Sequence, residues 1–183
     1  QQIAKLAAEH PKASGRMAAL AALRHLSGAH RYPEVNAALL AGVSDKDVLV
    51  IASAIDASSH NDPALSERIR ALLTHTDPQV RGRATLKHAR FVAAGRDTQQ
   101  VEATVPVVLA MTKDKSAFVR SEAADALVAL GNLPSIHTLM DMIDDDSNNT
   151  IQTSFVDLGG VKRTFRSRAS GWSRVDDACI WAI

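Results

Sequence analysis

Three basic side chains recur at helical spacing in the middle of the chain. Arg83, Lys87 and Arg90 are separated by four and three residues, so they share one face of a predicted helix. Guanidinium and ammonium groups on one face could hold carboxylates or phosphates through charge-assisted hydrogen bonds. The alternative is a solvated helix face without a ligand. We predict that these three side chains contribute to a partner-binding surface.

A second basic group lies near the C-terminus, in a segment where aromatic residues are interleaved with the cations. Its members are Lys162, Arg163, Phe165, Arg166, Arg168, Trp172 and Arg174. Arginine beside aromatic rings suits an acidic partner or phosphate, and the rings can stack on bases. From this group we select Arg163, Arg166 and Trp172 as binding candidates; the alternative is a solvent-exposed loop.

Metal chemistry has little support in the sequence. None of the seven histidines forms an HExxH motif, and no two are spaced four apart. Asp144, Asp146 and Asn148 alternate as in a calcium-binding loop, but Asn149 stands where glycine is needed and Phe155 where glutamate is needed. We therefore predict no metal site, and an acidic helix end that runs into a turn.

Catalytic and cofactor motifs are also missing from the sequence. There is no GxSxG, no P-loop and no GxGxxG pattern. Cys179 is a lone cysteine at a position expected to be buried, and His88 lies on an apolar stripe as an inter-helix residue. We predict a protein with no catalytic residues, no enzymatic activity and no cofactor.

Composition bounds the class of protein. The 183 residues are 46% hydrophobic, 22% charged and 4% aromatic, which is typical of an ordered globular chain. The formal net charge of +1 gives no global field toward nucleic acid or membrane. The lone cysteine excludes an internal disulfide and favours a reducing compartment, so we expect a cytoplasmic protein. The missing initiator Met and the final IWAI suggest a piece of a longer chain.

The elements that must position these residues repeat along the chain. In the segment 105–132, an apolar stripe runs along a predicted helix at Val119, Ala123, Leu127 and Leu130. Ser116 is expected to cap the start of this helix, and Gly131 its end. Asp62-Pro63 and Asp77-Pro78 are each typical of an N-cap followed by proline in the first turn.

The spacing of these helices indicates two helices per repeat. Val48 and Val80, each the first valine of a predicted second helix, are 32 residues apart, and Val80 and Val119 are 39 apart. We assign the extra residues to a longer connection over 92–104, followed by a helix from Val105 with Pro106 in its first turn. Such periods predict an all-α solenoid, in which stacked helix pairs hide one another's apolar faces.

The run VPVVLAMTKDKSAFVRSEAADALVALGNLPSIHTLMDMIDDD resembles a HEAT repeat, most closely the bilin-lyase-type HEAT-like repeats of bacteria, and TDPQVRGRATL is a second match. The residues that carry the resemblance are Val105-Pro106, Asp114, Val119-Arg120, Ala123-Ala124, Ala126-Leu127 and Leu130-Gly131. It covers roughly residues 31–146 and fades toward the N-terminus. It implies a right-handed α-solenoid of four to five helix pairs whose second helices line the concave side.

The resemblance also assigns roles to single residues. It places Arg83, Lys87 and Arg90 in the concave groove. Arg81 and Arg120 occupy the family's Val-Arg position, which implies pairing with an aspartate of a neighbouring turn. The paired His-Glu motifs of family members that bind di-iron are absent from this sequence.

The repeat pattern breaks after Asp146. TSFVDL and VKRTFR flank Gly159-Gly160, which predicts a β-hairpin. RVDDACIWAI, residues 174–183, matches a second helix, so we predict an insertion over 147–172 within the last repeat. The alternative is a helix over 150–158 with a new element from Val175.

Residues 1–183 are thus expected to form a single HEAT-like repeat domain. We expect a non-catalytic scaffold that binds a partner protein through the concave surface and the inserted loop, with no membrane contact. One alternative is a nucleic-acid (polyanion) binding protein, related to DNA repair like the glycosylase relatives of the fold. Another is an enzyme subunit acting on a bilin or similar cofactor, which the fold resemblance alone suggests.

Overall fold

The computed structural model describes residues 1–26, 32–59, 62–131, 151–156 and 162–167. Its helices, in chain order, are α1 (Gln2–Glu9), α2 (Ala13–His25), α3 (Pro33–Val43), α4 (Val48–Ala57), α5 (Pro63–Ala71), the 3-10 turn η2 (Leu72–Thr74), α6 (Pro78–Gly95), α7 (Thr98–Met111) and α8 (Ala117–Leu130). The strands are β1 (Ile151–Val156) and β2 (Lys162–Ser167).

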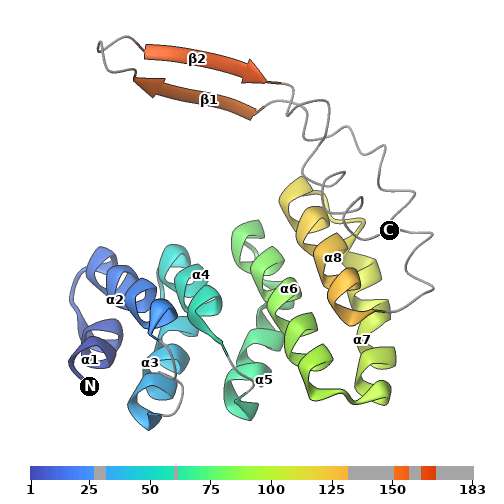
Figure 1. Ribbon diagram of the computed structural model, residues 1–183, viewed down its shortest axis with the longest axis horizontal. Coiled ribbons are helices and arrows are strands. Elements are labelled where there is room, and N and C mark those ends of the chain that lie inside the picture. Colours follow the sequence, from blue (N-terminus) through green and yellow to red (C-terminus); the bar gives the residue numbers. More distant parts are fainter. Residues whose placement is uncertain (27–31, 60–61, 132–150, 157–161, 168–183) are drawn as a thin grey trace.

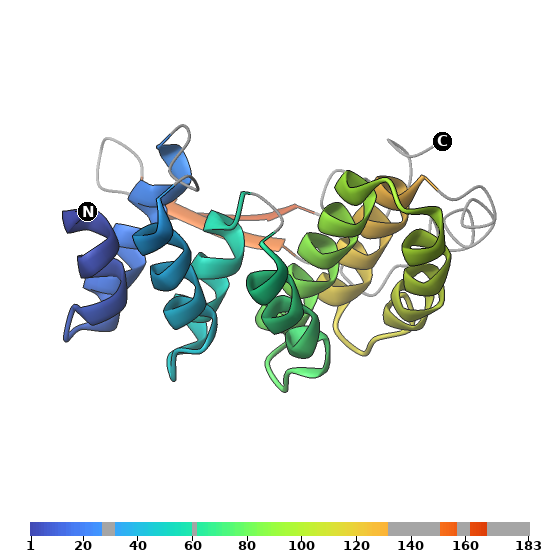
Figure 2. The same ribbon diagram turned by 90° about the horizontal axis from the view of Figure 1, so that it is seen from below.

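The helices form successive pairs: α1 with α2, α3 with α4, α5 with α6, and α7 with α8 (Figure 1). The second helices α2, α4, α6 and α8 contact one another in order and make one layer, which we call the second-helix layer. On the other side, α1 contacts α3 and α3 contacts α5, as Figure 2 also shows. Within the described residues there are four helix pairs, and the prediction of a helical repeat is confirmed.

Small and branched apolar side chains fill the space between the layers. Leu20, Ile55, Leu65 and Val80 are almost completely buried and come from four different helices. The first pair, α1 and α2, lies in a region where the family resemblance had faded. It completes the stack through buried alanines of α1, because alanine lets helices approach closely.

Helix ends follow the predicted capping residues in most cases. Asp62 accepts the backbone N–H of Leu65 at 3.0 Å, and Asp77 accepts that of Gln79 at 2.8 Å. Pro63 and Pro78 are each the first residue of their helix, where a missing N–H removes no hydrogen bond. Gly131 ends α8 with a φ of 63°, the left-handed conformation that glycine adopts without strain.

The start of α7 differs from the prediction. The helix begins at Thr98, not at Val105, and Pro106 lies inside it. Asp97 caps it by accepting the backbone N–H groups of Gln99 at 3.0 Å and Gln100 at 3.3 Å. The expected long connection over 92–104 is therefore wrong, because α6 extends to Gly95 and its extra residues are helical. Pro106 is tolerated on the exposed side of α7, where water can reach the carbonyl that lacks its N–H partner.

The two strands pair antiparallel, with Ile151 opposite Ser167 and Val156 opposite Lys162. The alternative of a helix over residues 150–158 is wrong, because β1 occupies most of that range. An insertion within a last repeat stays a prediction, since residues 132–150 and 168–183, with the expected helices and Cys179, lie outside the described residues. Among the helices that the structure does describe, none is long and apolar enough to span a membrane.

Candidate partner-binding surface

Helix α6 positions three of the predicted binding residues. Its N-terminus is fixed by Asp77 and Pro78, and it buries Val80 and Ala84 in the core. Arg83, Lys87 and Arg90 share one helical face that borders these core residues, at a spacing of four and three residues. Two of them, Arg83 and Lys87, contact the C-terminal end of α4, which has 10 residues against 18 in α6.

Arg83 spans three neighbouring helices. Its Nη1 donates to Asp56 Oδ2 of α4 at 2.5 Å, and both side chains are 33% exposed. Its guanidinium carbon lies 5.8 Å from the centre of the Phe118 ring of α8, within cation–π range. Arg83 Nε is buried and has no hydrogen-bond partner among the described residues. This side chain is thus held in place by contacts within the protein.

Lys87 binds backbone carbonyls at the C-terminal end of α4. Its Nζ donates to the backbone carbonyl of Ser58 at 2.6 Å and is 3.5 Å from that of Asp56. A cation at a helix C-terminus is favourable because the last carbonyls carry partial negative charge. Burial lowers the pKa of Lys87 to about 8, and Arg90 and Arg24 lower it further while Asp56 acts in the opposite direction.

Arg24 was not predicted as a site residue. It lies in the last turn of α2, is exposed, and is close enough to Lys87 to lower its pKa. Helix α4 packs against both α2 and α6, and this packing places Arg24 near Lys87. Helical spacing could not have found Arg24, because it belongs to a different helix from Lys87.

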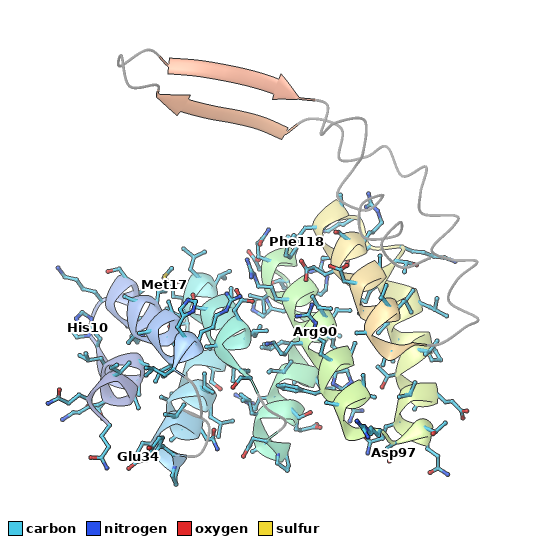
Figure 3. The ribbon with its side chains drawn as sticks, in the orientation of Figure 1. His10, Met17, Glu34, Arg90, Asp97 and Phe118 are labelled. Atoms are coloured by element: carbon cyan, nitrogen blue, oxygen red, sulfur yellow. The ribbon has the colours of Figure 1, made fainter. Side chains whose placement is uncertain are left out.

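Arg90 is the exposed member of the predicted α6 trio (Figure 3). Together, Arg24, Lys87 and Arg90 form what we call the basic cluster. The structure brings the three predicted α6 residues together with one additional arginine, and it shows that two of the predicted three, Arg83 and Lys87, also hold helices together.

The predicted residues of the hairpin are placed only by their strand positions. Arg163 and Arg166 belong to β2, where they pair with Phe155 and Gln152 of β1, respectively. Trp172 lies outside the described residues.

Arg81 pairs with an aspartate of a neighbouring turn, as predicted. Its Nε and Nη2 donate to the two carboxylate oxygens of Asp114 at 2.8 and 2.9 Å, and its Nη1 donates to the carbonyl of His75 at 2.6 Å. The hydrogen bond from Arg81 lowers the pKa of Asp114. Arg120 donates to the backbone carbonyl of Asp114 at 2.8 Å, and its aspartate partner stays a prediction. We call the bidentate Arg–Asp pair a clasp.

A second clasp joins Arg16 to Asp45 and was missed in the sequence. The two bonds measure 2.7 and 2.9 Å, and Arg16 Nη1 also donates to the carbonyl of His10 at 2.9 Å. Burial alone would raise the pKa of Asp45, but the bonds from Arg16 and from backbone N–H groups outweigh it and the pKa is lowered. The available signal was spacing: Arg16 follows His10 by six residues, as Arg81 follows His75.

His88 lies between helices, as the apolar stripe predicted. It lines a groove of about 280 Å³ together with residues of α5 and α7, and its Nδ1 is buried without a hydrogen-bond partner in the described part of the chain. Burial lowers its pKa, and Arg70 adds to this effect. No group of three or more metal-binding side chains occurs among the residues that the structure describes.

Comparison with known proteins agrees with the architecture. A family model for HEAT repeats matches residues 65–157, which is just over half of the chain. None of the curated proteins compared with the chain gives a match. The matched segment begins within α5 and includes α6, α7 and α8, and with them the Arg81–Asp114 clasp and most of the basic cluster. The chain therefore belongs to the HEAT repeat family.

Proposed function

We propose that this chain is a non-catalytic scaffold that binds a partner protein through its second-helix layer and the segment 147–172. HEAT repeats generally serve as protein-interaction scaffolds, and the family is generally non-catalytic. In this proposal the solenoid is right-handed, its second-helix layer is concave, and the hairpin is inserted in the last helix pair. The lone cysteine supports a reducing compartment such as the cytoplasm.

One observation supports the proposal most strongly: cations on the second-helix layer are fixed before any partner binds. Arg83 is held by Asp56 and Phe118, and Lys87 by the carbonyls at the end of α4. Side chains that are already ordered lose less conformational entropy on binding, so contacts to them yield more net affinity. The anchors of this proposal remain Arg83, Lys87, Arg90, Arg163, Arg166 and Trp172.

Nucleic-acid binding is the second candidate, because arginine and lysine on one layer could contact phosphates. A polyanion gains affinity from many phosphate contacts along a continuous basic track. The basic cluster is a small group of three cations, and the formal net charge of the chain is only +1, so we rank this function second.

A pair of crosslinking variants tests the proposal. A photo-reactive residue at Ala94, which is exposed and follows Arg90 by four residues on α6, probes the second-helix layer. The matched control is the same residue at Glu102, which is exposed on α7. We expect protein adducts in a lysate at position 94 but not at 102. Equal labelling at both positions, or adducts to nucleic acid alone, would contradict the scaffold function.

A further inference from the structure

The basic cluster has more positive charge than its surroundings balance. Arg24 and Arg90 both act on Lys87 and lower its pKa, and the carboxylate that acts on Lys87 in the opposite direction is Asp56. That carboxylate is already engaged by Arg83. The chain as a whole has a formal net charge of only +1, so this concentration of cations is local.

The cluster divides into fixed and free cations. Lys87 is hydrogen-bonded to the carbonyls at the end of α4. Arg24 and Arg90 are exposed, and within the described part of the chain neither makes a hydrogen bond or ion pair. Two exposed guanidinium groups without a partner among the described residues thus lie near a half-buried ammonium group, on the two helices that pack against α4.

We propose that the basic cluster is a docking site for an acidic segment of the partner protein, which would bridge α2 and α6 across the end of α4. Carboxylates of such a segment would accept bidentate hydrogen bonds from Arg24 and Arg90. The inference rests on the proposed scaffold function, and it adds the chemistry of the partner and the residue Arg24.

The arrangement favours a short acidic protein segment over a nucleic acid. The cations of the cluster are confined to the end of α2 and the middle of α6. A duplex or long single strand gains affinity from many phosphate contacts along a continuous basic track, which three cations do not form. A segment with a few carboxylates matches the two exposed arginines, so electrostatic complementarity selects it.

Fluorescence anisotropy with a labelled poly-glutamate peptide tests the proposal. The decisive variant is Arg24→Gln/Arg90→Gln, and the matched control is Arg70→Gln, which removes an exposed arginine of α5 that pairs weakly with Glu67. We expect the double variant to weaken peptide binding at least about fivefold and the control less than about twofold. Binding should also weaken as salt is raised from about 50 to about 200 mM.

Two results would overturn the inference. One is equal peptide affinity for the wild type and the double variant. The other is tighter, cluster-dependent binding of an oligonucleotide of matched charge, which would make nucleic acid the partner class. Crosslinking from position 94 separates this inference from the scaffold function. If the double variant still forms the same protein adducts, the scaffold function stands and the acidic docking site fails; if no variant forms protein adducts, the scaffold function itself fails.

Discussion

The interfaces between successive second helices, which we call seams, are held together in two different ways. At the α2–α4 seam, Arg16 clasps Asp45, and at the α6–α8 seam, Arg81 clasps Asp114. Among the described residues, the α4–α6 seam between them has no clasp. It is spanned by Arg83, which pairs with Asp56, and by Lys87, which binds the carbonyl of Ser58.

The difference arises at two sequence positions. In each turn before a second helix, one side chain accepts the backbone N–H two residues ahead; these residues are His10, Asp45, His75 and Asp114. Histidine and aspartate both serve this local role, but only a carboxylate can also receive a bidentate guanidinium. The third turn has His75, and α4 has Ile51 where α2 and α6 have Arg16 and Arg81. Both halves of the clasp are therefore missing at one seam.

The comparison indicates that the clasp arginines stabilise the repeat array, whereas the exposed arginines are available to bind a partner. Each clasp arginine contacts a carbonyl of the turn before its own helix and the aspartate of the next such turn. About a tenth of its side chain is exposed. At the unclasped seam, the cations remain on the second-helix layer, and Arg24 and Arg90 make no hydrogen bond or ion pair within the described part of the chain. The seam that lacks a clasp is thus the one that we propose to meet the partner.

Removing a clasp should have the largest effect on stability. Arg81→Met leaves the partly buried carboxylate of Asp114 and two turn carbonyls without their donor, so we expect a loss of about 2–4 kcal/mol in the free energy of unfolding. Urea denaturation measures it. Arg70→Met is the exposed control, with an expected change below about 0.5 kcal/mol. A clasp variant no less stable than the control would show that the clasp does not hold its seam.

The unclasped seam should respond to alkaline pH. The pKa of Lys87 is about 8 in the folded protein, below its ordinary 10.5, so the unfolded chain binds more protons between these values. Stability attributable to Lys87 should therefore rise as pH increases from about 8 to about 10.5, by on the order of 1–3 kcal/mol. Lys87→Met should remove this rise, and Lys113→Met, an exposed control, should keep it. Urea unfolding near pH 7.5 and near pH 10 measures the difference.

A clasp can be introduced at the seam that lacks one. Ile51→Arg alone replaces a buried apolar side chain with an unpaired cation and should destabilise the protein. His75→Asp supplies the missing carboxylate, so the double variant should recover about 1–2 kcal/mol relative to the sum of the single changes. A double-mutant cycle in urea measures this coupling. Additive effects would mean that the α4–α6 seam has a different geometry from the clasped seams.

Local signals predicted the helical repeat and several of its helix ends. Asp62-Pro63, Asp77-Pro78 and Gly131 act through neighbouring backbone groups, so their roles can be predicted from adjacent residues. Pro106 misled the prediction because proline also occurs inside an exposed helix. Asp97, the true cap of α7, has no proline after it and was overlooked.

The candidate site was only partly predictable. Helical spacing was enough to group Arg83, Lys87 and Arg90, since all three belong to α6. Spacing could not show that Asp56 and Ser58 would engage two of them, because those contacts join residues about 30 positions apart. Arg24 belongs to α2, so only the packing of α2, α4 and α6 brings it near Lys87.

The most direct test measures stability and binding in the same two variants. For Arg81→Met and Arg24→Gln/Arg90→Gln, we would determine the free energy of unfolding in urea and the affinity for the poly-glutamate peptide. We predict opposite patterns: the clasp variant loses stability but binds the peptide normally under folding conditions, and the double variant keeps its stability but loses at least about fivefold in affinity. If both variants lose stability and affinity together, or if the double variant binds as the wild type does, the division between clasped and partner-facing seams is contradicted.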